Sequence, residues 1–261
     1  MKIIATDYDG TLNHNGIDEK KKAAISLWRK KGNLFGVVSG RGVKSLFDVI
    51  KDKDFEYDFL IGNNGGVICD KNLNILTETK INGDIIVPFI KDLFEWGCPF
   101  VNVDVSEKAF MTRADKDDCD DDEFTLEDLP EIPEFNQMST MLDTNIEAAE
   151  ITKKIEEKYN GILTPLLNGD CIDIVPFGVN KAFGIYELLK VVNGKYEDVI
   201  AVGDNINDTH MIKEFRSYAM ANGVDYIKSI ADYVTTGITE LIEKELESWW
   251  RRKLRKIIDN R

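Results

Sequence analysis

Two carboxylates follow a short apolar stretch near the start of the sequence. Residues Ile3–Ala5 are apolar enough for a buried strand, and Asp7 and Asp9 come soon after it. Gly10 then permits a sharp turn. Open α/β sheets bind ligands at the carboxyl ends of their strands, where two acids can hold a metal ion or act as nucleophile and acid–base. An ordinary acidic turn explains this stretch equally well, so the later sequence must decide.

Further polar residues lie at the ends of other predicted strands. Ser39 follows the second strand, and Lys181 opens a helix much later in the chain. Asp204, Asn207 and Asp208 follow another apolar strand. Four carboxylates in one crevice would repel each other unless a cation lay among them, and oxygen ligands favour Mg²⁺. A lysine, a hydroxyl and an amide beside that ion are suited to holding phosphoryl oxygens.

A sheet has to bring these residues together, because they lie far apart in the sequence. Strands are predicted at 3–5, 34–38, 59–61, 199–202, 218–220 and 233–235. Helices are predicted at 18–31, from just after Arg41 to about residue 51, and at 181–192. A hairpin is predicted from strands at 67–69 and 73–76. Because strands alternate with helices, the pattern predicts an α/β fold with a parallel, doubly wound sheet.

The pattern changes between about residues 82 and 175. Helices are predicted at 85–96 and 145–159, and strands at 100–103, 109–112, 163–167 and 171–175. Here the strands are grouped and do not alternate one for one with helices. This order favours a separate α+β unit inserted into the first domain.

Composition limits the possible partners. The chain has 33 basic and 47 acidic residues, a formal net charge of -14, which disfavours general binding to nucleic acids or anionic membranes. The 4 cysteines form no C-x-x-C pair, so we expect neither a zinc site nor a redox motif. No apolar run approaches the roughly 20 residues that span a bilayer, and no signal region is evident. We therefore expect a cytoplasmic protein with reduced thiols and without nucleic-acid or membrane partners.

Together the motifs resemble the four motifs of the haloacid dehalogenase superfamily. In chain order they are Asp7-Tyr8-Asp9-Gly10-Thr11, Ser39, Lys181 and Gly203-Asp204-x-x-Asn207-Asp208. The stretch from Val38 to Arg41 and the large insert between the serine and lysine motifs are similar to the Cof-like branch. The resemblance spans residues 3 to about 236 and implies a Rossmann-like core at residues 1–80 and 177–261. The α+β cap is then expected at 81–176.

The resemblance implies two catalytic residues. Asp7 would attack phosphorus and form an aspartyl-phosphate. Asp9 would protonate the leaving oxygen and then activate the water that hydrolyses the intermediate. A dehalogenase needs no acid for its halide, so a carboxylate at position 9 favours phosphoryl transfer.

The resemblance also implies binding roles. Mg²⁺ would be held by Asp7, the backbone carbonyl of Asp9, and Asp204, with Asp208 either a ligand or a residue behind the ligands. The other expected substrate-binding and phosphate-binding residues are Thr11, which would also orient Asp9, and Ser39, Gly40, Arg41, Lys181 and Asn207. Arg41 could instead pair with a carboxylate of the core.

The implied function is Mg²⁺-dependent hydrolysis of a small phosphomonoester such as a sugar phosphate, by a monomer or homodimer. Two alternatives stay open: a phosphomutase on the same scaffold and a non-catalytic module that binds phosphorylated ligands or a partner. The acidic run at 115–123 is interpreted as a solvated loop, since it lacks the glycine of a calcium loop. A helix with a basic end is predicted at 238–258, packed on its own domain or at a dimer contact.

Overall fold

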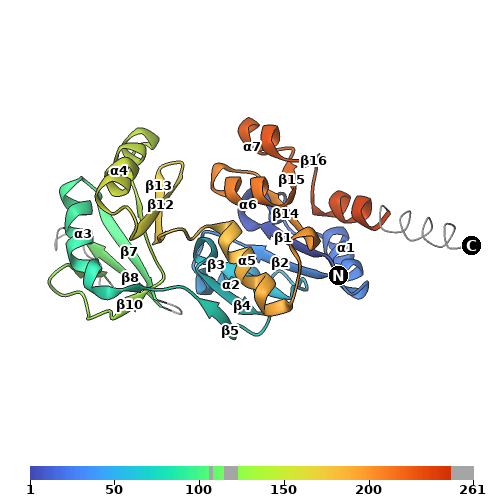
Figure 1. Ribbon diagram of the computed structural model, residues 1–261, viewed down its shortest axis with the longest axis horizontal. Coiled ribbons are helices and arrows are strands. Elements are labelled where there is room, and N and C mark those ends of the chain that lie inside the picture. Colours follow the sequence, from blue (N-terminus) through green and yellow to red (C-terminus); the bar gives the residue numbers. More distant parts are fainter. Residues whose placement is uncertain (106–107, 115–122, 248–261) are drawn as a thin grey trace, which may run out of the picture.

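The computed structural model describes residues 1–105, 108–114 and 123–247 (Figure 1). These residues form two lobes, each built on its own sheet, which we call the core sheet and the cap sheet. The predicted acidic loop falls almost entirely outside the described residues, as does the basic end of the C-terminal helix. Residues 238–247 of that helix are described and are helical.

The core sheet has eight strands in the spatial order β16-β15-β14-β1-β2-β3-β4-β5. All neighbours from β16 to β3 are parallel, and β4 and β5 are antiparallel additions at one edge. The strands are β1 (Ile3–Asp7), β2 (Leu34–Val38), β3 (Phe59–Gly62), β4 (Val67–Asp70), β5 (Ile75–Glu78), β14 (Val199–Gly203), β15 (Arg216–Met220) and β16 (Tyr233–Thr235). The predicted α/β fold class is confirmed.

Helices cover both faces of the core sheet. They are α1 (Glu19–Lys30), α2 (Val43–Ile50), α5 (Lys181–Val192), α6 (Thr209–Glu214) and α7 (Asp225–Ile230). Alternate residues of β1 face opposite sides: Ile3 packs against α5 and α6, and Ile4 packs against α1. Asp18 begins α1 as predicted, since its carboxylate accepts a hydrogen bond from the Lys21 N–H at 2.8 Å.

The cap sheet has six strands in the order β12-β13-β11-β7-β8-β9. They are β7 (Phe100–Val105), β8 (Lys108–Arg113), β9 (Glu123–Thr125), β11 (Gln137–Met141), β12 (Leu163–Asn168) and β13 (Cys171–Pro176). Helices α3 (Ile86–Glu95) and α4 (Asn145–Lys158) lie on the side of this sheet that faces away from the core (Figure 1). The cap is inserted between β5 and α5.

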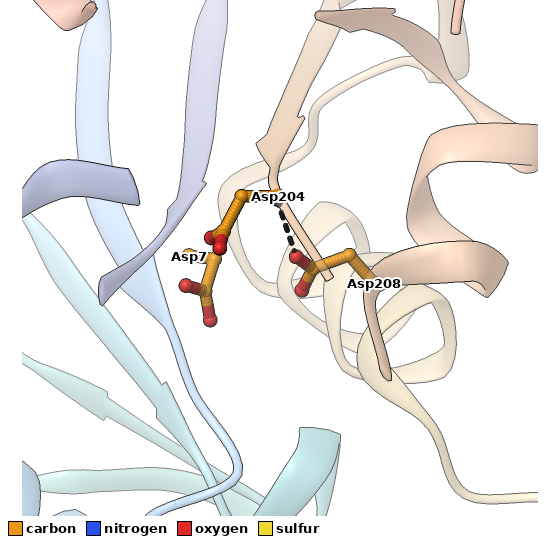
Figure 2. Close-up of side chains that lie close together, drawn as sticks. All are labelled: Asp7, Asp204 and Asp208. Carbon is orange, nitrogen blue, oxygen red and sulfur yellow. Dashed lines mark hydrogen bonds between the residues drawn. The ribbon is translucent and has the colours of Figure 1, made fainter. Parts of the chain in front are cut away.

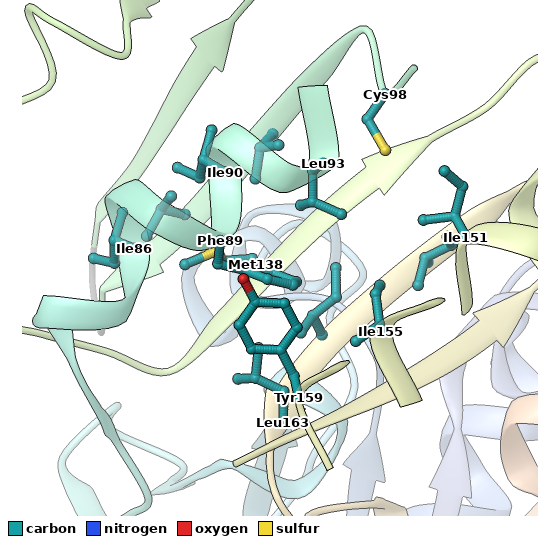
Figure 3. Packing of buried hydrophobic residues seen from close by; sticks show 14 of the residues in the cluster. Ile86, Phe89, Ile90, Leu93, Cys98, Met138, Ile151, Ile155, Tyr159 and Leu163 are labelled. Atoms are coloured by element: carbon teal, nitrogen blue, oxygen red, sulfur yellow. The ribbon is translucent and has the colours of Figure 1, made fainter. Parts of the chain in front are cut away.

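The two faces of the cap sheet differ in polarity because its side chains alternate. Val103, Met138 and Ile174 are fully buried and pack with Phe89 of α3 and Ile155 of α4 (Figure 3). This cluster forms the hydrophobic core of the cap. The residues between these apolar positions lie on the opposite face, which leaves a polar surface turned toward the core domain.

The sequence prediction differs from the structure in the β4–β5 hairpin. Leu73 was expected in the second strand, but it lies in the turn with a φ of 64°. The Asp70 carboxylate accepts hydrogen bonds from the N–H groups of Asn72 and Asn74 at 2.8 and 2.9 Å. Because this side chain holds the turn, the turn is longer than predicted and β5 begins at Ile75. The short strands β6 (Ile81–Asn82) and β10 (Glu134–Phe135), which pair with each other, and the helix α6 were not predicted.

Candidate active site

The central strands of the core sheet place Asp7 beside Asp204. Asp7 is the last residue of β1, and Asp204 directly follows β14, the parallel neighbour of β1. Beyond Asp7 the chain makes a tight, kinked turn from Tyr8 to Leu12, in which Asp9 and Gly10 have non-helical dihedral angles and the φ of Gly10 is 81°. A Cβ atom at Gly10 would overlap the Asp204 carboxylate. Only glycine therefore allows this close approach.

Three carboxylates gather at this strand end: Asp7, Asp204 and Asp208 (Figure 2). One oxygen of each lies within 4.8 Å of the others. Burial raises the pKa of Asp7 well above its ordinary value, with Lys181 opposing the shift and the neighbouring acids adding to it. Burial also raises the pKa of Asp204. These groups are therefore hard to ionise together without a nearby cation.

Lys181 supplies one positive charge to this group. Its Nζ lies 2.6 Å from Oδ1 of Asp7 and 2.5 Å from Oδ1 of Asp208, and its side chain has no exposed area. Burial works against the charged form, but the charges of Asp208 and Asp7 raise the pKa of Lys181 overall. The lysine is the first residue of α5, and the preceding Asn180 caps this helix, because its side chain accepts a hydrogen bond from the Phe183 N–H.

Both oxygens of Asp208 already have protein partners. Oδ1 contacts Lys181, and Oδ2 accepts from the backbone N–H groups of Asp204 and Asn205 at 2.8 and 3.1 Å. A side chain at Gly203 would collide with this carboxylate. Asp208 was predicted to be either a metal ligand or a residue behind the ligands. This geometry favours the second role, in which Asp208 holds Asp204 and Lys181 in place.

Thr11 has a different partner from the one predicted. Its hydroxyl is fully buried and donates to Oδ1 of Asp204 at 2.5 Å. It therefore fixes a candidate metal ligand, and Asp9 is held by another residue. Sequence reasoning could not see this contact, because it joins residues at the ends of two different strands.

Asp9 lies apart from the other three acids. It is exposed and forms an ion pair with Arg41, with 2.7 Å between Arg41 Nε and Asp9 Oδ2 and 3.2 Å between the second pair of atoms. Of the two partners considered for Arg41, the structure thus gives it a carboxylate of the core. Four carboxylates were predicted to meet, but only the other three lie together in the structure.

The remaining predicted residues line one cavity of about 570 Å³ between the core and the cap. Ser39, Gly40 and Asn207 reach it from the core, together with Asp7 and Asp9. Ser39 is buried and accepts from the backbone N–H of Arg41 at 3.2 Å. Lys181 and Asp204 are not part of the cavity wall and lie behind Asp7. The cavity is therefore a place where a phosphoryl group could meet the Asp7 carboxylate.

The opposite wall comes from the polar face of the cap sheet. Its polar residues include Asn102 and Asp104 of β7, Gln137 and Ser139 of β11, and Asp173 of β13. Sequence analysis named none of them. The available signal was the alternation of polar and apolar residues in Asn102–Asp104, Gln137–Met141 and Cys171–Ile174, but it does not say which face meets the core.

Direct hydrogen bonds join the cap to the core at this cavity. Asn64, which has a φ of 51°, donates to Asp173 at 2.8 Å and to Gln137 at 3.2 Å. Gln137 donates in turn to the backbone carbonyl of Gly40 at 3.0 Å. Asn64 lies in the turn that follows β3, and through these bonds it also contacts the cap.

The three-carboxylate group fits a divalent cation of the oxygen-binding kind. Asp7 and Asp204 can offer carboxylate oxygens, and a cation beside them would favour their ionised forms, against the burial that raises the pKa of both. No helix in the described part of the chain is both long and apolar enough to cross a membrane.

The α/β core, the inserted cap and the group of acids at the strand ends are features of one hydrolase family, and comparison with known proteins identifies it. The sequence model of the haloacid dehalogenase-like hydrolases matches residues 4–240. The chain therefore belongs to this hydrolase family, and the predicted membership is confirmed.

Two curated relatives of similar length are named as phosphatases. The chain is 26% identical over 266 residues to the 5-amino-6-(5-phospho-D-ribitylamino)uracil phosphatase YcsE of Bacillus subtilis, covering 95% of this chain and 96% of that protein. It is also 26% identical over 259 residues to a phosphoglycolate phosphatase of Methanothermobacter thermautotrophicus, covering 94% and 98% of the two chains. The predicted enzyme class, a phosphatase of this family, is confirmed.

Solved structures share the complete fold. The protein SMU.1108c from Streptococcus mutans has a TM-score of 0.80 and 25% identity, covering 95% of this chain and 99% of that one. The subclass IIB sugar phosphatase BT4131 has a TM-score of 0.75 and 19% identity, covering 94% and 98%. Both support the Rossmann-like core with an inserted cap.

Proposed function

We propose that this protein is a Mg²⁺-dependent phosphatase that hydrolyses small phosphomonoesters through an aspartyl-phosphate on Asp7. The observation that carries the proposal is the group of Asp7, Asp204 and Asp208 around Lys181 at one end of a cavity. Attack on an anionic phosphate requires positive charge beside the attacking carboxylate. Here Asp7 lines the cavity and has both a buried cationic partner, Lys181, and a candidate metal group next to it.

Two bond exchanges complete the reaction. First, an Asp7 oxygen attacks phosphorus, the bond from phosphorus to the leaving oxygen breaks, and protonated Asp9 gives that oxygen its proton. Second, water attacks phosphorus and passes a proton to Asp9, and the bond to Asp7 breaks to release phosphate. Asp9 is thereby returned to its starting state.

Other residues of the chain bind and position. Ser39 and Asn207 line the cavity and are proposed to donate to phosphoryl oxygens, while Lys181 neutralises Asp7 from behind. Arg41 holds Asp9 by two hydrogen bonds, and Gly40 connects the phosphate-binding segment to the cap.

Asp7, the backbone carbonyl of Asp9, and Asp204 are proposed to hold Mg²⁺, with Asp208 fixing their arrangement. The bound ion would neutralise phosphoryl charge and so lower the repulsion between two anions. Residues 1–80 and 177–261 are proposed as the catalytic core and 81–176 as the cap that covers the substrate. Cytoplasmic location and a monomeric or homodimeric state stay predictions.

A screen of phosphorylated metabolites, with and without Mg²⁺, tests this function. Phosphate release from sugar phosphates and from p-nitrophenyl phosphate, lost on adding EDTA and restored by excess Mg²⁺, is the expected result. Isomer formation without phosphate release, detected by NMR, would identify a phosphomutase. Absence of turnover with every compound, including p-nitrophenyl phosphate, would contradict catalysis and favour a binding module.

A further inference from the structure

The wall of the cavity formed by the cap is acidic. Asp104 and Asp173 line it, beside the neutral polar residues Asn102, Gln137, Ser139 and Asn168 and the less polar residues Ala109, Met141 and Cys171. Arg41 is the one cation among the lining residues that the structure describes, and it is already paired with Asp9. A ligand in this cavity therefore meets negative charge at the end opposite its phosphoryl group.

Neither acid forms an ion pair within the described chain, although the charge of Lys181 partly offsets the effect of burial on the pKa of Asp173. The side chain of Asp104 accepts one long hydrogen bond of 3.4 Å from the Asn63 amide. Asp173 accepts from Asn64 at 2.8 Å and from Gln137 at 3.4 Å, both neutral amides. Lys108 lies nearby, on the wall of a smaller adjoining cavity of about 300 Å³ that Asp104 also lines.

Acceptor atoms also lack donors behind this wall. The amide oxygens of Asn63 and Asn64 are buried and have no hydrogen-bond partner among the described residues. Each of these amides already uses its NH₂ group on a carboxylate, Asn63 on Asp104 and Asn64 on Asp173. These two oxygens are enclosed and their residues do not line the cavity, so the acceptors open to a bound molecule at the cap end are the carboxylate oxygens of Asp104 and Asp173.

We propose that Asp104 and Asp173 make this site selective for phosphomonoesters whose leaving group is rich in hydroxyl or amino donors and carries no second negative charge. This inference rests on the proposed phosphatase function and specifies its substrate class. Of the substrates named for the relatives above, a polyol phosphate fits this wall, and phosphoglycolate, with its carboxylate, does not.

Repulsion explains the discrimination. A carboxylate or second phosphate placed against Asp104 would be brought close to a like charge in a partly desolvated cavity, and this repulsion disfavours its binding. Hydroxyl groups at the same place would instead donate to carboxylate oxygens, giving hydrogen bonds stronger than those between neutral groups.

Three hexose phosphates of nearly equal size isolate this charge effect. Glucose 6-phosphate, glucosamine 6-phosphate and 6-phosphogluconate carry the same phosphate ester but differ in charge at the other end. At pH 8, above the raised pKa of about 7 for Asp104 and of about 6 for Asp173, both acids are charged. We expect kcat/KM for 6-phosphogluconate at this pH to be about tenfold to a hundredfold below that for glucose 6-phosphate, and glucosamine 6-phosphate to be at least as good as glucose 6-phosphate.

Substitutions assign the effect to the cap. Asp104→Asn keeps the size of the side chain and removes its charge, so it should reduce the discrimination against 6-phosphogluconate by about tenfold. Asp173→Asn should act in the same direction, but it also disturbs the contact with Asn64, which makes Asp104→Asn the primary variant. Asp143→Asn is the matched control, because it removes one exposed acid of the cap that does not line the cavity.

The outcomes separate this inference from the function on which it rests. Equal kcat/KM for all three hexose phosphates, with normal turnover of p-nitrophenyl phosphate, would overturn the selectivity and leave the phosphatase intact. Discrimination that persists unchanged in Asp104→Asn and Asp173→Asn, both folded by circular dichroism, would also overturn it. Absence of turnover with every compound would instead contradict the proposed function.

Discussion

The ammonium nitrogen of Lys181 lies 2.6 Å from Oδ1 of Asp7, although 174 residues separate the two in the sequence. The insertion of the cap between them accounts for much of that separation, and helix α5 returns the lysine to the end of β1. Since both side chains are buried, each depends on the other for neutralisation.

Replacing Lys181 should therefore destabilise the fold as well as the site. Lys181→Ala would leave the carboxylates of Asp7 and Asp208 buried without their partner, a change that typically costs about 3–5 kcal/mol. Urea unfolding measures the loss, and Lys190→Ala on the same helix is the control because Lys190 is 70% exposed. Equal stabilities of the two variants would show that the buried ion pairs do not support the fold.

Asp9 is predicted to act in both halves of the reaction, and the second half can be isolated. With p-nitrophenyl phosphate the leaving group needs little protonation, so Asp9→Asn should still form the phosphoenzyme. Hydrolysis of the intermediate should slow by about a hundredfold or more, because the general base is missing. Stopped-flow absorbance should then show a burst of p-nitrophenolate close to one per enzyme, followed by slow turnover.

Two results would contradict the proposed role of Asp9. A uniform loss of rate without a burst would place the role of Asp9 before the phosphoenzyme, and unchanged kinetics would remove it from the chemistry. Arg41→Ala serves as the companion variant. It should change stability by less than about 1 kcal/mol, because the ion pair with Asp9 is exposed.

Stability should depend on pH through the acids of the cap. Burial, and secondarily the charge of Asp173, raises the pKa of Asp104 to about 7, and burial raises the pKa of Asp173 to about 6. Since an unfolded Asp has a pKa of roughly 3.9, the folded protein binds more protons between these values. Its free energy of unfolding should fall as pH rises from about 4 to about 7.

Asp104→Asn removes one of these titrations. The variant should lose less stability than the wild type between pH 5 and pH 8, with the difference on the order of 1 kcal/mol. Denaturant unfolding at both pH values, with Asp143→Asn as control, measures this difference. A wild-type stability that rises over this range in step with the variant would contradict the role of Asp104.

The sequence predicted the parts of the site that a parallel sheet places by itself. Asp7 and Asp204 follow adjacent strands, so the rule that ligands bind at strand ends was sufficient to bring them together. Ser39 follows the strand on the other side of β1 for the same reason. The order of these motifs was also enough to identify the family.

The sequence could not predict how individual side chains divide their contacts. Thr11 donates to Asp204, and Asp9 turns toward Arg41, because of distances that exist only once the strands are assembled. The cap wall was missed for a related reason. Asp104 and Asp173 lie in strands whose residues alternate between polar and apolar. This alternation does not reveal which face of the sheet an inserted domain presents to the core.

The most direct test concerns the nucleophile. Asp7→Asn keeps the shape of the side chain but removes the attacking oxygen anion, so turnover of p-nitrophenyl phosphate with Mg²⁺ should fall by about a thousandfold or more while circular dichroism shows an intact fold. Mass spectrometry of acid-quenched wild-type enzyme should detect one phosphoryl group on the peptide that contains Asp7, absent from the variant. Near-normal turnover by Asp7→Asn would contradict the proposed mechanism.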